Sequence, residues 1–565
     1  MGYLKPPAPR RRHDPYGFAA GRATCDDSRR CHAGAALSAT PEAAVNAIQL
    51  SLFVSRLTAV CDEMAAVLRN AALSPNIRDR LDFSCAVFDA DGALCAQAAH
   101  IPVHLGSMAY AMADLVARFD WADGDMVIVN DPYLGGTHLP DVTLIAPVFA
   151  AAGNGRQTLL GFVANRAHHA DIGASTPGSM PISARLEEEG VVIPPRLLVR
   201  AGVPDAEVLA EITGATRSPQ HARGDFFAQI AANRAGVARV AALVDAAGMD
   251  AFRAGLGAMN DYGERLARAA VRAIPDGRYA FEDMLDDDGR GQQDIPIRLA
   301  LTIAGDSALC DFTGTAPQVQ GNVNCPLAVV AAAVFYCFRC LMPPETPACA
   351  GALRPLALHA PEGSLLNARR PAAVAAGNVE TSTRIVDVVL GALAQAENGH
   401  WHGRIPAASH GSMNNLAIGG VRDGAAWDYY ETIGGGMGAG AVGGGLSAVQ
   451  THMTNTLNTP IEVIESRFPL RVTCYAIRRG SGGAGARPGG DGLIRELECL
   501  APAHATLIGE RRRHAPWGIQ GGKPGQPGAQ WHNHRPLPGK IALDLAPGDR
   551  LRIETPGGGG CGAGS

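Results

Sequence analysis

A long amphipathic helix is the first element that the hydrophobic pattern predicts. Thr40-Pro41-Glu42 offers a capping hydroxyl, a proline suited to the first turn and an acid at the positive end of the helix. We therefore expect the helix to begin near Thr40 and to end at about Ala72, because Ser74-Pro75-Asn76 follows. The apolar side chains that recur at helical spacing on one face are Val45, Ile48, Leu52, Val60, Met64 and Val67.

Short apolar runs bounded by turn residues predict buried strands in the rest of the chain. These strands are expected at residues 85–88, 126–129, 142–148, 159–164, 300–303 and 308–312. An Ala-rich helical stretch from about Phe226 to Ala273 is broken at Gly248. Glycine runs at 434–436, 443–445 and 557–560 predict loops where backbones pack closely or bind a ligand. The pattern as a whole predicts a large mixed α+β fold with antiparallel sheets and a long N-terminal helix.

Length and composition limit the domain organisation and the class of protein. The 565 residues would suit three to four domains, at roughly 150 residues each. Residues 1–40 are rich in Pro, Arg, Gly and Asp and predict a disordered tail, whereas no long linker divides residues 41–565. The net charge of −5 argues against general binding of nucleic acid, which requires a basic field. We therefore expect one interwoven unit after the tail.

Lysine and cysteine usage exclude two kinds of site. Lys5, Lys523 and Lys540 are the only lysines, and none follows a glycine-rich turn as a P-loop lysine would. The 13 cysteines are an odd number without paired spacing, which is typical of reduced thiols in a cytosolic protein. The longest apolar run, Leu327–Phe338, is too short to cross a bilayer. The sequence therefore predicts a cytoplasmic protein without a nucleotide loop of this kind or a membrane span.

Two predicted strand ends carry the densest cluster of reactive side chains. The first strand leads into a loop with His138 and Asp141, and the second ends in Ala167-His168-His169-Ala170-Asp171. Two strand ends that each offer imidazole and carboxylate can close around one divalent metal, and this ligand set suits zinc, manganese or iron. A lone His-x-x-Asp is more often a turn hydrogen bond, so the prediction depends on the two ends together. Neighbouring histidines on a strand point to opposite faces, so we expect only one of His168 and His169 to be a ligand.

Other polar motifs carry weaker signals. His100 and His104 flank Ile101-Pro102-Val103, and a core or turn role is the better interpretation of both. Gly377–Ser382 suits substrate contacts or the start of a helix. His532-Asn533-His534 lies in a Pro/Gly-rich stretch that does not favour a metal site, and Cys337-Phe338-Arg339-Cys340 lies in an apolar run typical of core.

A series of polar and glycine-rich motifs runs in order from about residue 42 to 562. They are Ser74–Ile77, Arg80–Cys85, His100–Ser107, Asp131–Asp141, Ala167–Gly173, Arg223–Asp225, Gly321–Pro326, Gly377–Ser382, Gln450–Thr456, Gly480–Gly485, Arg511–Arg513 and Thr555–Gly560. With these motifs the sequence resembles the hydantoinase B/oxoprolinase family, the B-type components of ATP-dependent lactam hydrolases. Departures from the family pattern are Ala174, His410 (where glutamine is usual) and Cys561.

The resemblance implies that residues 41–565 form the catalytic domain of an enzyme that opens a cyclic amide, 5-oxoproline or a hydantoin. ATP would be bound by a separate A-type partner, which phosphorylates the lactam carbonyl. By position in the motif, His138, Asp141 and His168 would hold a divalent ion, whether manganese, zinc or magnesium. The hypothesis assigns proton transfer to His169 and Asp171. It assigns the pairing with a substrate carboxylate or phosphate to Arg166 and Arg384.

Three other functions stay open at this point. The chain could be a component of an ATP-dependent acetone- or acetophenone-type carboxylase, which the same resemblance includes. It could be a non-catalytic protein that assembles with the A-type partner, although the clustered histidines and aspartates argue against this. It could also be a metallohydrolase that acts alone. A hetero-oligomer with a hydantoinase A-type, ATP-binding partner and a small lactam substrate is the preferred prediction.

Overall fold

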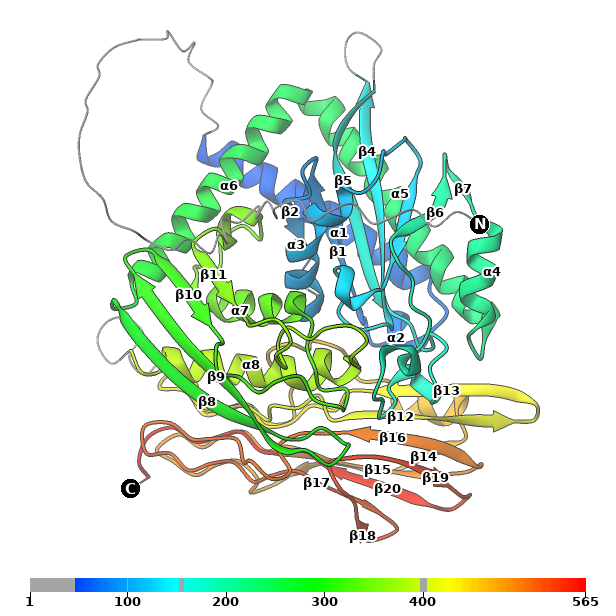
Figure 1. Cartoon of the computed structure of the whole chain (residues 1–565), viewed down its shortest axis with the longest axis vertical. Helices are drawn as coiled ribbons and strands as arrows, with labels where there is room; N and C mark the ends of the chain where they lie inside the picture. Colours follow the sequence, from blue (N-terminus) through cyan, green and yellow to red (C-terminus); the bar gives the residue numbers. More distant parts are fainter. Residues whose placement is uncertain (1–45, 99, 152–156, 397–403, 565) are drawn as a thin grey trace.

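The computed structural model describes residues 46–98, 100–151, 157–396 and 404–564 (Figure 1). The predicted tail and the predicted helix start near Thr40 lie outside these ranges. The α-helices are α1 (Ala47–Ala71), α2 (Pro75–Arg78), α3 (Pro102–Val116), α4 (Ala206–Gly214), α5 (Pro219–Ala247), α6 (Met249–Arg272), α7 (Leu327–Leu341), α8 (Ser382–Leu393) and α9 (Ile461–Arg467). Single helical turns are η1 (Pro132–Leu134), η2 (Pro177–Ser179), η3 (Leu186–Glu189), η4 (Ala350–Leu353) and η5 (Gly377–Thr381).

The strands belong to four sheets. The first sheet comprises β1 (Phe83–Asp89), β2 (Leu94–Gln97), β3 (Met126–Val129), β4 (Asp141–Ala151), β5 (Gln157–His168), β6 (Arg196–Arg200) and β7 (Val203–Pro204). The second comprises β8 (Gly277–Asp287), β9 (Gln293–Ala304), β10 (Ser307–Asp311) and β11 (Leu356–His359). The third comprises β12 (Asn415–Arg422), β13 (Ala425–Glu431), β16 (Ala503–Ile508) and β19 (Lys540–Leu545). The fourth comprises β14 (Leu470–Arg478), β15 (Gly492–Cys499), β17 (Ala529–His532), β18 (Arg535–Pro536) and β20 (Arg550–Glu554).

The first sheet confirms the strands predicted near its centre, in the order β2-β1-β5-β4-β3-β6-β7. Different helices pack on its two faces. Helices α1 and α5 pack on the face that carries Val142 and Val163, and α3 packs on the face that carries Ile145 and Ala164. Since side chains alternate along a strand, every second residue of β4 and β5 belongs to the α3 face. This alternation decides which side chains at the ends of β4 and β5 point toward α3, where the candidate site lies.

The predicted N-terminal helix is present but its first turns are not part of a core. Asn46 caps α1 through a capping box with Gln49, and the helix ends at Ala71 as expected. Ile48 and Leu52 lie on the helix as their spacing predicted, but they are 75% and 53% exposed. The buried face begins one turn later and contacts α5.

The middle of the chain confirms the predicted helix break and the predicted hairpin. Helices α5 and α6 meet at Gly248, whose φ of +84° suits a glycine between two helices. Strands β9 and β10 pair as predicted, but β10 and β11 run parallel, so the expectation of antiparallel sheets has this exception. Helices α7 and α8 pack against this region and lie between the first sheet and the C-terminal strands (Figure 1).

The C-terminal third forms layers across the base of the molecule (Figure 1). The third and fourth sheets pack together through Leu416, Ile418, Leu497 and Leu551 among others. The chain offers no described helix with both the length and the apolar character needed to cross a membrane.

Beside these sheets lies a region that we call the glycine layer, formed by residues 434–445, 481–490, 517–525 and 557–562. Its segments are joined by backbone hydrogen bonds, such as Gly490 N–H to Met437 O at 2.8 Å and Gly558 N–H to Gly490 O at 2.9 Å. A Cβ atom on Gly436 would lie 1.9 Å from Gly490 O, and one on Gly558 would lie 2.1 Å from Met437 O. The predicted close backbone packing is therefore confirmed at these positions, which leave no room for side chains.

Candidate metal centre

Strands β4 and β5 bring the predicted ligands together at one end of the first sheet. Asp141 opens β4, His168 closes β5, and the two residues are partners in the antiparallel ladder. His138 belongs to the turn before β4, where its carbonyl accepts a hydrogen bond from Asp141 N–H at 3.1 Å. The loop therefore curls as the spacing required, and all three side chains are buried.

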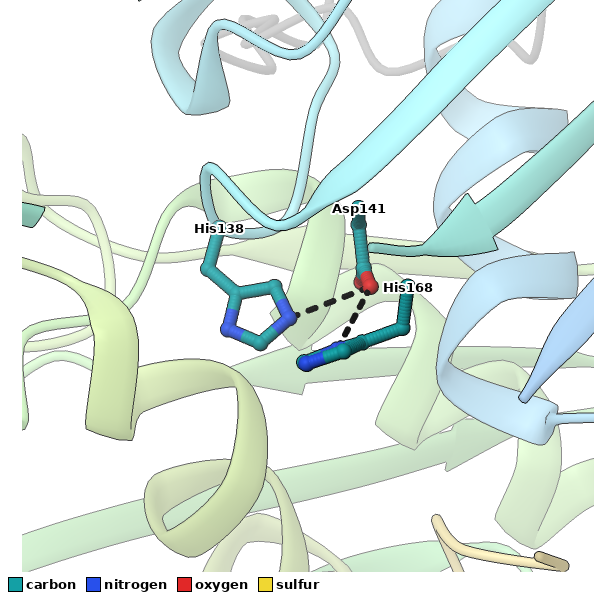
Figure 2. Close-up of side chains that lie close together, drawn as sticks. All are labelled: His138, Asp141 and His168. Carbon is teal, nitrogen blue, oxygen red and sulfur yellow. Dashed lines mark ion pairs between the residues drawn. The ribbon is translucent and has the colours of Figure 1, made fainter. Parts of the chain in front are cut away.

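The cluster of His138, Asp141 and His168 has the spacing of ligands around one ion. Asp141 Oδ1 lies 3.1 Å from His138 Nε2 and 3.3 Å from His168 Nδ1 (Figure 2). With metal bonds near 2.1 Å, neighbouring ligand atoms are about 3.0 to 3.4 Å apart. One atom from each residue lies within 4.8 Å of the others, and no other group of three His, Cys, Asp or Glu in the described chain offers such an arrangement.

The two oxygens of Asp141 have different roles. Oδ2 accepts a hydrogen bond from Thr137 Oγ1 at 2.5 Å and contacts His104 Nε2 at 3.1 Å. Oδ1 has no hydrogen-bond partner among the described residues, although it is buried and faces two imidazoles. A buried carboxylate oxygen without a hydrogen bond is costly unless something else compensates it. The residues therefore fit a divalent cation between Oδ1 and the two rings.

The electrostatics of the cluster keep a negative charge on the aspartate. Burial alone would raise the pKa of Asp141, but His104 and His138 outweigh it and hold that pKa well below its usual value. Burial lowers the pKa of His168 and therefore favours the neutral imidazole, the form that binds metals. Burial alone would lower the pKa of His138, but Asp141 outweighs it and raises that pKa, so a metal ion bound here would displace a proton from the His138 ring.

His104 is a site residue that the sequence analysis placed in the core or in a turn. It lies on α3, contacts Asp141 and lies 3.4 Å from Ser84 Oγ through Nδ1. Helix α3 covers the face of β4 and β5 to which Asp141 and His168 point. In the sequence, only the place of His104 in the His100–Ser107 motif pointed to this role. The local pattern does not show which helix will cover the strand ends.

Asn378 and Tyr430 are two further site residues, and they come from distant parts of the chain. Asn378 Nδ2 lies 3.0 Å from His138 Nε2 and 3.4 Å from Asp141 Oδ2. The Tyr430 ring stacks flat on the His168 ring, with centroids 4.8 Å apart and planes 9° from parallel. Asn378 belongs to a motif predicted for substrate contacts or a helix start, and it does precede α8. The sequence pattern gave no signal for Tyr430.

His169 and Asp171 do not join this cluster. His169 turns to the opposite face of the sheet, as alternation predicted, where its Nε2 lies 3.0 Å from Gln229 Oε1 on α5 and its ring stacks on Phe226. Asp171 pairs with Arg217 at 3.1 Å. Both residues line a separate pocket of about 470 Å³ on the α5 side. Their assignment to proton transfer stays a prediction that the geometry of the cluster does not support.

Arg166 and Arg384, predicted to bind substrate, both donate to protein acceptors. Arg166 lies on the same face as His168 and donates to Thr143 Oγ1 at 2.8 Å, Ser107 Oγ at 2.6 Å and Gly135 O at 3.0 Å. Burial lowers its pKa to about 10.

Arg384 lies apart from the cluster, on α8, where it donates to Met284 O and to Glu510 at 3.2 Å. Neither guanidinium presents its planar pair of donors to the cluster. A role in binding substrate therefore stays a prediction for both arginines.

The family of the chain follows from a match to the model of hydantoinase B/oxoprolinase over residues 46–564. The chain belongs to this family, as the motifs indicated. It is 38% identical to 5-oxoprolinase 1 of Arabidopsis thaliana over 92% of its own length, and it spans only 42% of that longer protein. It is 31% identical to a protein of Pseudomonas sp. NS671 named as the B component of a D-/L-hydantoinase, over 92% of this chain and 90% of that protein.

Two solved structures share the fold. The ATP-dependent caprolactamase of Pseudomonas jessenii aligns over 92% of this chain and 91% of its own, with a TM-score of 0.83 and 28% identity. An acetone carboxylase in its nucleotide-free state aligns over 91% of this chain and 75% of its own, with a TM-score of 0.81 and 19% identity. The second likeness concerns the fold alone. The predicted mixed α+β fold and the predicted family are confirmed, and the predicted likeness to acetone carboxylase is confirmed for the fold.

Proposed function

We propose that the chain is the B-type component of an ATP-dependent cyclic amidase, with a divalent-metal site at His138, Asp141 and His168. The relatives named as 5-oxoprolinase, hydantoinase B component and caprolactamase support a cyclic amide as the substrate class. The observation that carries the metal site is Asp141 Oδ1, buried between two imidazoles without a hydrogen bond. Two imidazoles and one carboxylate suit manganese, zinc or iron.

A divalent ion held here would supply Lewis acidity, which polarises a carbonyl or phosphoryl oxygen and acidifies water. The residues of the chain would supply its position. Thr137 and His104 hold Asp141 Oδ2, so Oδ1 stays directed at the two rings. His104, Asn378 and Tyr430 line a small pocket beside His168. His104 is therefore better placed than His169 to exchange a proton with a water molecule in that pocket, whose volume of about 20 Å³ has room for little more.

ATP would be handled by an A-type partner. A lactam resists hydrolysis because its nitrogen donates electron density to the carbonyl, and phosphorylation of the carbonyl oxygen removes this protection. Of the two described lysines, Lys540 is buried and paired with Glu510 at 2.5 Å, and Lys523 lies in a loop of the glycine layer. Neither follows a glycine-rich strand-to-helix turn. The described cysteines are free, which supports a reducing cytosol as the proposed location.

The test is reconstitution with a hydantoinase A-type protein. ADP release would be measured with 5-oxoproline, hydantoins and caprolactam, in the wild type and in His138→Ala. We expect lactam-dependent ATP turnover that His138→Ala reduces to the background without this chain, together with loss of bound metal. His534→Ala, an exposed histidine away from the cluster, is the matched control and should retain both.

Two results would refute the proposal. Full turnover and full metal content in His138→Ala would remove the metal site from the mechanism. Bicarbonate-dependent consumption of acetone, without turnover of any lactam, would assign the chain to the carboxylases instead.

A further inference from the structure

The pocket of about 470 Å³ on the α5 side of the first sheet is separate from the metal centre. Its wall comes from α2, the segment after β5, the start of α5, β13 and the end of α9. Three motifs of the sequence meet there, Ser74–Ile77, Ala167–Gly173 and Arg223–Asp225. The metal centre takes only His168 from these motifs. A pocket of this volume is large enough to hold a small organic molecule.

Several charged side chains around the pocket are already paired within the protein. Asp225 accepts hydrogen bonds from two backbone N–H groups, at 2.7 and 3.1 Å. Asp171 pairs with Arg217 at 3.1 Å, and Arg78 pairs with Asp79 at 2.9 Å. These side chains build the wall, and their charges are compensated without a ligand.

Asp428 is an acid of the pocket that has no cation of its own among the described residues. Its Oδ1 accepts a hydrogen bond from Gly178 N–H at 3.2 Å, while the guanidinium of Arg217 lies 4.0 Å away and donates to Asp171. The Asp428 side chain is only 7% exposed, so water compensates its charge poorly. Burial and the neighbouring Asp171 raise the pKa of Asp428 to about 6. A cationic group in the pocket would stabilise the ionised carboxylate.

Arg467 supplies the opposite charge at the edge of the same pocket. It is exposed at the end of α9 and forms no ion pair with a described residue. Ser74, which is 5% exposed, also lines the pocket, and its hydroxyl has no hydrogen-bond partner among the described residues. Apolar side chains form much of the remaining wall: Leu73, Pro75, Ala222, Trp427 and Phe468. The pocket therefore offers an anion and a cation that the protein does not pair, together with apolar surface.

We propose that this pocket binds a zwitterionic amino acid, with its ammonium group at Asp428 and its carboxylate at Arg467. The apolar wall suits an aliphatic chain between these two groups. Hydrolysis of a cyclic amide adds water across the C–N bond and leaves an amine and a carboxylic acid on one molecule. The product of the reaction is therefore a ligand of this class, and this identification of the ligand rests on the proposed function. The site itself depends on the residues of the pocket alone.

The experiment is a calorimetric titration of the full chain with 6-aminohexanoate, the amino acid that opening of caprolactam releases. Hexanoate and hexylamine are the matched probes, because each keeps the aliphatic chain and only one of the two charged groups. We expect 6-aminohexanoate to bind about tenfold more tightly than either probe, since both of its charged groups find a partner.

Two substitutions separate the roles of the charged side chains. Asp428→Asn keeps the oxygen that accepts from Gly178 N–H but removes the charge, so 6-aminohexanoate should bind about 10- to 100-fold more weakly while hexanoate keeps its affinity. Arg467→Met removes an exposed cation and should weaken binding by about fivefold. Asp423→Asn is the matched control, because Asp423 lies in the exposed turn of the β12–β13 hairpin, outside the pocket. This control should bind like the wild type.

The outcomes separate this inference from the proposed function. Wild-type affinity for 6-aminohexanoate in Asp428→Asn would overturn the site, as would the absence of saturable binding at millimolar concentrations. Hexylamine or hexanoate bound as tightly as 6-aminohexanoate would overturn the zwitterion. His138→Ala should bind the amino acid like the wild type, because the metal centre lies on the opposite face of the sheet. Amino-acid binding without lactam-dependent turnover in any reconstitution would refute the proposed function and leave the site in place.

Discussion

The histidine–aspartate cluster and the glycine layer both bring together segments far apart in the sequence, and Gly436, Gly490 and Gly558 of the layer are buried as the cluster is. In the cluster, side chains make the contacts: His138, Asp141 and His168 meet at one carboxylate oxygen. In the glycine layer the backbones themselves make the contacts, as in the bonds that link Met437, Gly490 and Gly558. The cluster should therefore tolerate substitutions that remove atoms, at the expense of function. A single carbon atom added at a close contact of the glycine layer should lower the free energy of unfolding.

The most severe test of this difference is Gly558→Ala. The new Cβ would lie 2.1 Å from Met437 O and 2.3 Å from Met437 C, and these backbone atoms cannot move without breaking neighbouring hydrogen bonds. We expect a loss of more than about 3 kcal/mol in the free energy of unfolding, measured by denaturant titration, or no soluble protein at all.

Gly443→Ala is the control for this prediction. It lies in the same layer, its φ is not in the left-handed region, and no heavy atom lies within 4 Å of its added Cβ. Near wild-type stability is expected there. Equal stability of the two variants would show that the glycine layer is not held by backbone contact.

Protonation of His410, which contacts the glycine layer through its backbone, should lower the stability of the protein. His410 is 1% exposed, its backbone N–H donates to Gly436 O at 2.8 Å, and neither ring nitrogen has a hydrogen-bond partner among the described residues. Burial lowers its pKa to about 3, with further lowering by His452 and Arg512. The unfolded chain therefore binds a proton below about pH 6.5 that the folded chain does not, so stability should fall as the pH drops.

The slope is about 1.4 kcal/mol per pH unit, or about 2 kcal/mol between pH 6.5 and pH 5. His410→Gln removes the titrating group and should flatten this part of the stability curve. The measurement is the free energy of unfolding of both proteins at pH 5, 6 and 7. Parallel curves for the variant and the wild type would contradict the assignment.

Sequence reasoning succeeded where the structure depends on local periodicity. The apolar runs located β1, β3, β4 and β5, and alternation along β5 placed His168 and His169 on opposite faces of the sheet. It failed where a residue's role depends on which distant element covers it. His104, Asn378 and Tyr430 reach the cluster from α3, η5 and β13, and no local pattern encodes those packings. Ile48 and Leu52 show the reverse case, helical periodicity without a core against it.

The smallest predicted effect concerns two neighbouring tyrosines of β13, of which only one contacts the histidine–aspartate cluster. Tyr430 stacks on His168, and its hydroxyl donates to Asn415 Oδ1 at 2.6 Å. Tyr429 points to the core between the C-terminal sheets, where its ring packs near Phe468. Both are buried, so both leucine variants should lose stability, and Tyr429→Leu also leaves Glu431 and Arg495 without the hydroxyl that they contact.

Only Tyr430→Leu should change the metal site. Without the flat stack, the His168 ring is free to turn about its side-chain bonds, so its nitrogen spends less time directed at Asp141 Oδ1. We expect metal affinity to fall by about tenfold in Tyr430→Leu and to stay unchanged in Tyr429→Leu and Tyr430→Phe, since phenylalanine keeps the stacked ring. An equal loss of affinity in both leucine variants would mean that general loosening of β13, rather than the ring on His168, controls the site.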